Sequence, residues 1–280
     1  MGSTNWVVEL LKKALETWND KMTEIWQLLT TSPKEFKGGG IWSVITNIHG
    51  GLQAVGYALL VLFFVVGVVR TTTSFAEIKR PEQAFKLFIR FAAARALITY
   101  GMELLLAVSD IAQGVVTRIS GSAGNVLTAG AALPDEIQQK ILACGFLESI
   151  PLMLVALLFI VLVTVLSFVM ILTVYSRFFT LYMYTAVAPL PLATFAAEGS
   201  SAVGGHFVKS FAGVCLQGAV IALACIIYSV FARSMPLNYD ANTSAVNMVW
   251  CYMGELCFNL LVLVGTVKTS ERVIKDMIGF

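Results

Sequence analysis

The chain has little charge and almost no histidine, and each shortage excludes a class of function. Charged residues make up 13% of its 280 residues, about half the share of a typical soluble domain. The net charge of +2 is too small for electrostatics to predict nucleic-acid binding. Most of the chain therefore lacks a water-facing surface.

Residues that carry chemistry are equally scarce. His49 and His206 are the only histidines and lie far apart, and the five cysteines contain no CxxC pair. The sequence therefore predicts neither a metal centre nor a redox centre. It has no HExxH motif, no nucleotide-binding loop and no paired carboxylates in an aqueous setting. We expect a protein that is not an enzyme and that holds no cofactor.

Long apolar runs dominate the sequence instead. Hydrophobic residues make up 58% of the chain, and its mean hydropathy is +0.80. A helix that crosses the hydrocarbon core needs about 20 apolar residues, and residues 150–174 alone exceed this length. The sequence predicts an all-α polytopic membrane protein, with an interfacial helix and linker in residues 1–40 and a transmembrane domain in residues 41–280. The five predicted spans are residues 51–69, 84–116, 150–175 with a bent extension to residue 195, 207–231 and 245–267.

Pro189 and Pro191 interrupt the end of the third span. Each proline removes a backbone donor and clashes with a continuing helix. Lipid tolerates such a break only where protein or a water-lined cavity covers the freed backbone. We therefore expect the helix to bend here and the bent segment to be packed.

Residues 4–31 form a predicted amphipathic helix. Apolar residues recur at spacings of three and four along one side, while lysines and acidic residues occupy the other side. We expect this helix to lie flat on the membrane surface; the alternative is a helix packed on a partner or on the rest of the protein. Tryptophan favours the water–lipid interface, and the predicted interfacial anchors are Trp6, Trp18, Trp26 and Trp42.

The loop between the second and third spans contains a helix-start signal, a proline followed by two acidic residues at positions 134–136. A short amphipathic helix is expected after it. Its apolar residues Ile137, Ile141 and Leu142 are predicted to face inward.

Basic residues orient the spans, because cytoplasmic loops carry an excess of lysine and arginine. One cluster follows the first span, Arg177 follows the third, and Lys268, Arg272 and Lys275 follow the fifth. Five spans then place the N-terminus outside the cell and the C-terminus in the cytoplasm, although five lysines in residues 12–37 count against this orientation. The predicted cytoplasmic basic cluster is Lys79, Arg80, Lys86 and Arg90.

Charged residues inside the spans are expected to face a partner or a watery lumen, because a charge at membrane depth costs about 2.5–3.5 kcal/mol. Arg95 and Glu103 lie in the second span and Glu255 lies in the fifth. Glu103 and Glu255 are both expected near mid-membrane. The three residues are predicted to line a polar conduit or to pair across helices.

The alternative is that Lys86 and Arg90 reach the membrane interface, so that only the two glutamates need partners inside the membrane. Gln217 and Asn259 also lie inside spans, where they are predicted to form hydrogen bonds between helices.

Three segments carry a resemblance to a known family: residues 177–182 (RFFTLY), 186–193 (AVAPLPLA) and 204–218 (GGHFVKSFAGVCLQG). With its five spans and proline-broken third span, the chain resembles the TrbL-type polytopic inner-membrane subunit of type IV secretion and conjugation machines. The resemblance implies several copies in a ring in the bacterial cytoplasmic membrane. They would hold other channel subunits and cytoplasmic secretion ATPases in register while DNA–protein substrates pass. If DNA passes nearby, the basic cluster is the best electrostatic candidate for contact, and orientation of the spans is its alternative role.

A small-molecule or ion transporter is the competing class. Broken helices near mid-membrane mark binding sites in transporters, and residues 188–193 are the candidate for such a site. The sequence contains no internal repeat and no second broken helix in a matching position. The lack of these two transporter features favours the secretion subunit.

Overall fold

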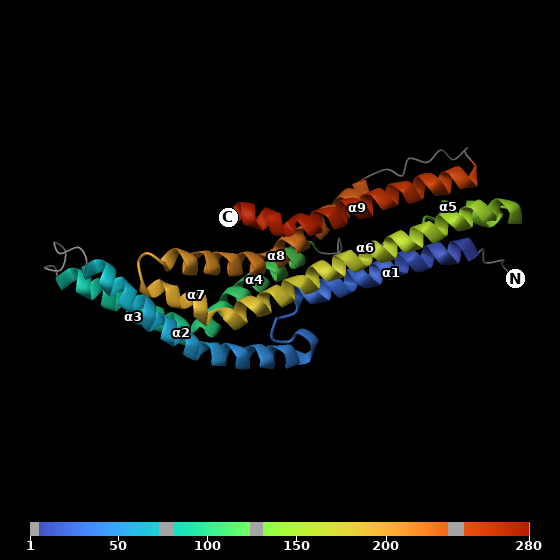
Figure 1. Ribbon diagram of the computed structural model, residues 1–280. Coiled ribbons are helices and arrows are strands. Elements are labelled where there is room, and N and C mark those ends of the chain that lie inside the picture. The colour runs from blue at the N-terminus through green and yellow to red at the C-terminus, as the bar shows by residue number, and fades with distance from the viewer. Residues whose placement is uncertain (1–5, 73–80, 124–130, 235–243, 280) are drawn as a thin grey trace. The chain divides into compact units, whose positions relative to one another are not determined.

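The computed structural model describes residues 6–72, 81–123, 131–234 and 244–279, and these ranges contain helices and no strand (Figure 1). The helices in chain order are α1 (Trp6–Thr30), α2 (Gly40–Thr72), α3 (Pro81–Thr99), α4 (Gly101–Ala123), α5 (Asp135–Ala143), α6 (Phe146–Val187), α7 (Pro189–Ala193), α8 (Ser201–Ser234) and α9 (Ala245–Ile278). Two 3₁₀ turns, η1 (Phe36–Gly39) and η3 (Thr194–Ala196), precede α2 and follow α7.

Five described stretches are long and apolar enough to cross a membrane, which confirms the predicted all-α polytopic membrane protein. They are Phe36–Val69, Gly101–Ser122, Ile150–Val187, Ser201–Phe231 and Val246–Ile278. Four of the predicted spans, residues 51–69, 150–175, 207–231 and 245–267, lie inside α2, α6, α8 and α9.

The predicted second span, residues 84–116, is corrected because the structure divides it. Helix α3 ends at Thr99 and α4 begins at Gly101. Glycine is a poor helix former, and the Leu192 side chain occupies the space that a Cβ at residue 101 would need. Glu103 therefore lies in the first turn of α4, not midway along a span.

Helix α6 includes the predicted third span, residues 150–175, and much of its predicted bent extension to residue 195. It runs for 42 residues without interruption, which is about 63 Å at the rise of an α-helix and about twice the hydrocarbon core of a bilayer. Arg177 therefore lies inside an apolar helix and does not mark its end. Helix α6 ends at Val187, and Pro189 opens the short helix α7.

The chain forms two compact units, and α4, α6, α8 and α9 contribute residues to both. The first unit comprises residues 1–30, 116–175 and 219–270. The second comprises residues 31–115, 176–218 and 271–280.

In the first unit, α1 buries its apolar face in protein. Val7 and Leu11 have 0% of their surface exposed and Trp18 has 4%. The side chain of Asn19 exchanges two hydrogen bonds of 2.9 Å with the backbone N–H and carbonyl of Ala131. The amphipathic helix thus packs on the rest of the protein, as the alternative interpretation held, and the expectation that it lies flat on the membrane is corrected.

Helix α5 confirms the predicted short helix before the third span, and it contacts α1. Ile137 and Ile141 are 0% exposed, whereas Leu142 is 47% exposed, so its predicted inward orientation is wrong. The hydroxyl of Tyr252 in α9 donates a 3.1 Å hydrogen bond to the carbonyl of Ala132. This bond and those of Asn19 hold the chain that leads into α5.

In the second unit, the short helix α7 and η3 pack against both α2 and α3. The predicted linker, residues 32–40, is also held in place. The Phe36 ring stacks on the Phe178 ring with 4.2 Å between their centres, and the Tyr182 hydroxyl donates a 2.8 Å hydrogen bond to the carbonyl of Pro33. The segment after α6 and the linker are therefore both packed against protein.

Candidate functional site

Helix α2 supplies the buried histidine that covers the break after α6. Pro189 has no N–H, so the carbonyl of Thr185, four residues earlier, loses its partner in the helix. His49 Nδ1 lies 2.7 Å from that carbonyl oxygen. Because a carbonyl only accepts, Nδ1 must carry the proton. His49 Nε2 is buried and has no hydrogen-bond partner among the described residues.

Helix α2 also approaches α7 very closely. A Cβ at Gly56 would lie 2.9 Å from both the Cβ and the carbonyl oxygen of Pro189. The glycine is therefore required for the two backbones to meet at this distance. The expected bent segment at Pro189 and Pro191 is thus packed against protein, with Pro189 buried and Pro191 half-buried.

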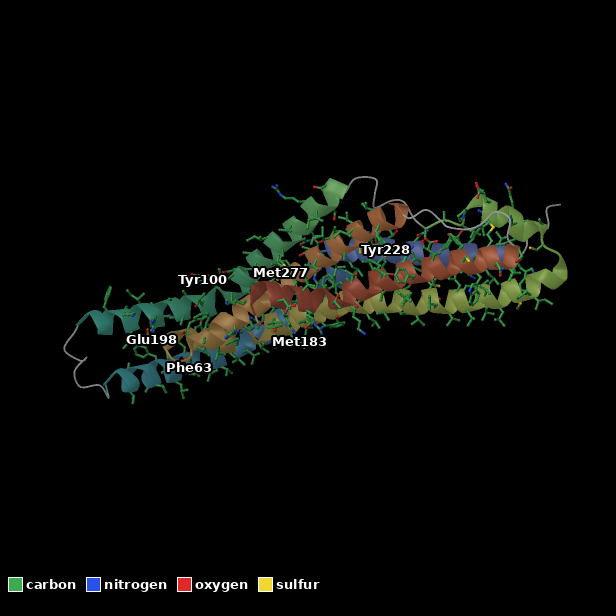
Figure 2. The ribbon with its side chains drawn as sticks, turned by 90° about the horizontal axis from the view of Figure 1, so that it is seen from above. Phe63, Tyr100, Met183, Glu198, Tyr228 and Met277 are labelled. Atoms are coloured by element: carbon green, nitrogen blue, oxygen red, sulfur yellow. The ribbon has the colours of Figure 1, made fainter. Side chains whose placement is uncertain are left out.

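The break between α3 and α4 has matching partners on α2. The Gln53 amide donates to the carbonyls of Ile98, at 2.8 Å, and Thr99, at 3.3 Å. The Tyr57 hydroxyl lies 2.9 Å from the hydroxyl of Thr99. Carbonyls at the end of a helix need such partners, so α2 satisfies both helix breaks of this unit. Tyr100, at the break itself, is exposed (Figure 2).

Beyond η3, Glu198 anchors the chain to α3. Its carboxylate accepts a 2.6 Å hydrogen bond from Arg90 and lies 3.8 Å from Lys86 Nζ. The hydrogen bond, followed by the charges of Arg90 and Lys86, holds the pKa of Glu198 below its ordinary value. Two members of the predicted cytoplasmic basic cluster therefore share an internal counter-charge. The other two, Lys79 and Arg80, lie outside the described residues.

Arg177 is the most unusual charged residue of the second unit. Its side chain is 6% exposed and its guanidinium packs on Gly218, where a Cβ would collide with it. Its Cζ lies 5.3 Å from the centre of the Phe178 ring. Nε and Nη1 are buried and find no acceptor in the part of the chain that the structure describes. Two donors of a buried cation are thus left open, which is costly.

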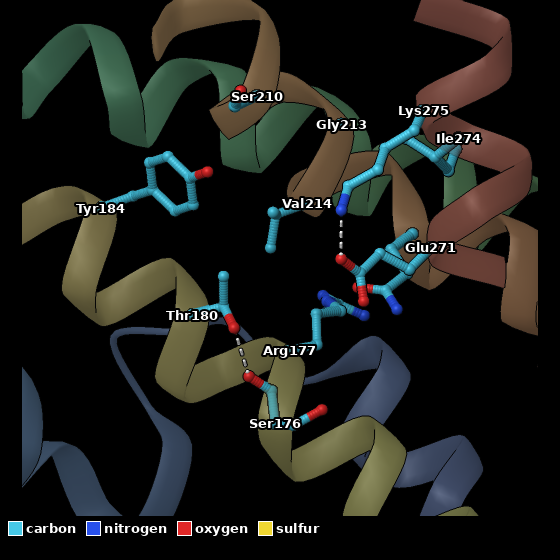
Figure 3. Close-up of a pocket in the computed structure, with 11 residues that line it drawn as sticks. Ser176, Arg177, Thr180, Tyr184, Ser210, Gly213, Val214, Glu271, Ile274 and Lys275 are labelled. Atoms are coloured by element: carbon cyan, nitrogen blue, oxygen red, sulfur yellow. Dashed lines mark hydrogen bonds and ion pairs between the residues drawn. The ribbon is translucent and has the colours of Figure 1, made fainter. Parts of the chain in front are cut away.

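Arg177 lines a pocket of about 490 Å³ formed by α6, α8 and the end of α9 (Figure 3). Glu271 and Lys275 extend into it from α9 and pair with each other at 2.7 Å. The other lining residues are mostly small or polar: Ser176, Thr180, Tyr184, Ser210, Gly213, Val214, Gln217 and Ile274. With one carboxylate and two cations, the pocket has a net positive charge.

The predicted polar conduit is not assembled as the sequence suggested. Arg95 and Glu103 are exposed and Glu255 is half-buried, and none of them forms an ion pair with a described residue. Arg95 and Glu103 belong to the second unit and Glu255 belongs to the first. Gln217 and Asn259 are buried as expected for residues inside spans. Gln217 lines the Arg177 pocket, whereas Asn259 Oδ1 has no described partner.

The predicted tryptophan anchors have different surroundings. Trp6 is 39% exposed, Trp26 and Trp42 are half-buried, and Trp18 is buried. The Trp42 ring centre lies 6.3 Å from that of Tyr182. Trp18 is therefore a packing residue, and burial removes it from the set of possible membrane anchors.

Sequence reasoning did not identify His49, Gln53 or Arg177 as site residues. His49 and Gln53 are polar side chains near or within an apolar run, which is a usable signal, but their partners are distant in sequence. Arg177 has a clearer signal, because about ten further residues of largely apolar helix follow it. That continuation distinguishes an internal cation from one at the end of a span.

The sequence pattern of the TrbL/VirB6 plasmid conjugal transfer like protein family matches residues 18–189. The chain belongs to this family. The match runs from α1 to the first residue of α7, so it includes His49, Gln53, Arg177 and both helix breaks of the second unit. Comparison with curated proteins and with solved structures gives no match. Membership confirms the predicted resemblance and makes the chain a multi-pass membrane protein of the conjugal-transfer type.

Proposed function

We propose that the protein is a non-catalytic channel or scaffold subunit of a type IV secretion machine, acting as a homo-oligomeric ring in the bacterial cytoplasmic membrane. It would hold secretion-channel subunits and cytoplasmic ATPases together while DNA–protein substrates cross. The observation that carries this proposal is the family match over residues 18–189. Five apolar stretches that can cross a membrane are consistent with it.

The packing of the second unit supports a rigid scaffold. Both helix breaks have their freed carbonyls bonded by α2 side chains, and α7 is enclosed by α2 and α3. A subunit that must hold neighbours in register benefits from bent helices whose angles are fixed by packing. The bends would then set which helix faces are offered to neighbouring copies.

The transporter alternative finds less support at residues 188–193. A broken-helix site leaves backbone groups free to bind a substrate. Here the carbonyl of Thr185 is bonded by His49 at 2.7 Å, and the carbonyl of Pro191 accepts a 2.6 Å hydrogen bond from the Thr194 hydroxyl. These groups are occupied within the chain, so the secretion subunit remains the better proposal.

The basic cluster is better explained by orientation than by DNA contact. Lys86 and Arg90 lie beside the Glu198 carboxylate, which reduces the positive charge that they offer to a phosphate backbone. We therefore place this end of α3 on the cytoplasmic side under the positive-inside rule. In that orientation the N-terminus is outside and the C-terminus is inside.

The deciding experiment is co-purification from native membranes. The protein carries a C-terminal tag, is extracted in mild detergent, and its companions are identified by mass spectrometry. Secretion ATPases, a coupling protein or other channel subunits are expected to co-purify in stoichiometric amounts. A lone monomer or small homo-oligomer, recovered while secretion complexes in the same extract stay intact, would favour a transporter.

A transfer assay tests the role of the bent segment. The variant Pro189→Ala/Pro191→Ala is expected to straighten the end of α6 and to reduce conjugal transfer at least about tenfold. A loss of about 1.4 kcal/mol in the free energy of assembly is enough for a tenfold effect. The control is Pro151→Ala, an exposed proline in the first turns of α6. Unchanged transfer by the double variant at normal protein levels would remove the bent segment from the mechanism.

A further inference from the structure

The Arg177 pocket has an opening and a floor of different character. Glu271 and Lys275, on the last turns of α9, have side chains that are 64% and 58% exposed. Arg177 is 6% exposed and its guanidinium packs on Gly218. A molecule that enters past α9 therefore meets exposed charges first and a buried cation at the end.

The floor of the pocket lacks an anion. Nε and Nη1 of Arg177 are buried donors with no acceptor among the described residues, and the carboxylate of Glu271 is paired with Lys275 at 2.7 Å. A guanidinium with open donors matches a phosphate or carboxylate group, because its planar fork can give two parallel hydrogen bonds to such an oxyanion. The Tyr184 side chain also lines the space and carries a further hydroxyl (Figure 3).

The size and surroundings of the pocket favour a phosphate that belongs to a lipid. A cavity of about 490 Å³ lies in the range of sites for whole small molecules, about 300–1,000 Å³, and exceeds what a bare phosphate fills. Exposed apolar residues lie within two positions of lining residues in the sequence: Phe179 and Met183 on α6 and Val273 and Met277 on α9. Such residues suit acyl chains, and basic pockets between membrane helices recur as headgroup sites.

We propose that this pocket binds the phosphate of an anionic phospholipid headgroup, with Arg177 as the principal recognition residue and Lys275 as an auxiliary cation at the opening. Free inorganic phosphate shares the oxyanion chemistry but has no acyl chains for the apolar flank. The site is independent of the secretion role, since a transporter with the same pocket would bind the same headgroup.

Glu271 provides the competing explanation. Its side chain lines the same pocket, so the competing explanation is that it pairs with Arg177 and that no ligand is needed. The two explanations predict different effects for Glu271→Gln. Removing a counter-ion weakens the folded protein, whereas removing a negative charge from the opening of an anion site strengthens anion binding.

The experiment uses the full chain in neutral detergent, titrated separately with phosphatidylglycerol, phosphatidylcholine and inorganic phosphate. Native mass spectrometry counts the bound lipids, and thermal unfolding records stabilisation. Phosphatidylglycerol is expected to bind and to raise the unfolding temperature, with phosphatidylcholine much weaker. Arg177→Lys should weaken phosphatidylglycerol binding about tenfold or more, Lys275→Gln less, and Glu271→Gln should strengthen it. Arg272→Gln, an exposed charge on the same turn that does not line the pocket, is the matched control.

Several results would overturn the proposal. Equal phosphatidylglycerol binding by the wild type, Arg177→Lys and Arg272→Gln would place the lipid elsewhere. An unfolding temperature for Glu271→Gln below that of Lys275→Gln, which breaks the same ion pair, without tighter lipid binding, would make Glu271 the counter-ion of Arg177. Stabilisation by inorganic phosphate equal to that by phosphatidylglycerol would show that the acyl chains contribute nothing.

Discussion

At the scale of single residues, the second unit depends on side chains that complete the hydrogen bonding of broken helices. The bond of 2.7 Å between His49 Nδ1 and the carbonyl of Thr185 replaces the N–H that Pro189 lacks. A carbonyl without a hydrogen-bond partner costs more free energy in an apolar environment than in water, because no water molecule can bond to it there. We therefore expect His49 and Pro189 to be energetically coupled although 140 residues separate them.

This coupling predicts a specific double-mutant cycle. His49→Ala should lower the free energy of unfolding by about 1–3 kcal/mol, because it leaves a buried acceptor unpaired. In a Pro189→Ala background the same change should cost less, since the new N–H of residue 189 can bond to the carbonyl of Thr185. Fluorescence-monitored unfolding in detergent measures the loss of unfolding free energy in both backgrounds. His206→Ala, at an exposed position of α8, is the control. Equal costs in the two backgrounds would show that the histidine and the proline act independently.

Gly218 makes a second prediction at this scale. A Cβ there would collide with the Arg177 guanidinium, so Gly218→Ala should destabilise the protein by about 1–3 kcal/mol. On the same helix, a Cβ at Gly205 would meet nothing within 4 Å, so Gly205→Ala should stabilise it by about 0.5–1 kcal/mol. The cost at Gly218 should shrink in an Arg177→Lys background, which lacks the branched group. Urea or thermal unfolding of the four variants decides this, and a harmless Gly218→Ala would contradict the close packing.

At the scale of helices, α2 organises the second unit. It packs against α3, α7 and η3, and its residues His49, Gln53 and Gly56 serve three separate contacts at intervals of three and four residues. This spacing places them on one face of a helix. One face of α2 thus supplies the hydrogen bonds at both helix breaks and the glycine that lets the proline segment pack closely.

The attachment of α3 to the segment after η3 is expected to depend on pH. The pKa of Glu198 is lowered in the folded protein, first by the hydrogen bond from Arg90 and then by the charges of Arg90 and Lys86. The contribution of this carboxylate is therefore complete above the unfolded pKa of about 4.3 and is lost as pH falls through the lower folded value. Wild type and Glu198→Gln should differ in unfolding temperature at pH 7, and the difference should shrink as pH falls below the unfolded pKa and through the lower folded value. Glu35→Gln, a substitution at another exposed glutamate, is the control. A difference between wild type and Glu198→Gln that does not shrink as pH falls would exclude ionisation as its cause.

The same elements show how far the sequence predicts this fold. The end of α6 followed from proline, whose effect is local and needs no knowledge of the partners. The division between α3 and α4 at Tyr100 did not follow from a local signal. Gly101 follows an alanine-rich helix, and the effect of this glycine depends on its contact with Leu192, 91 residues away. The prediction that Arg177 marks the end of the third span is wrong. It relied on the excess of arginine in cytoplasmic loops, which is a statistical tendency and does not apply to a buried cation. The partners of His49 and Gln53 are contacts distant in sequence, which apolar periodicity does not reveal.

At the scale of the whole molecule, the number of crossing stretches decides the sides on which the ends lie. Five stretches of the described residues qualify, and the proposed arrangement, in which all five cross, predicts that α1 and the end of α9 lie on opposite sides of the membrane. The end of α9 carries Lys268, Arg272 and Lys275, which favours the cytoplasmic side. Helix α1, although amphipathic, buries its apolar face in protein and adds no crossing.

Cysteine labelling of intact cells tests this arrangement. In a background with the five cysteines replaced, Lys13→Cys on α1 should react with a membrane-impermeant maleimide from outside, and Arg272→Cys on α9 only after the membrane is opened. Both positions are exposed, so their reaction with the maleimide reports the side of the membrane on which they lie and is not limited by burial in the protein. Reaction of both from the same side would mean that one stretch does not cross. Gly101–Ser122 would then be the first suspect, because it is the shortest of the five at 22 residues and contains Glu103, Asp110 and Arg118.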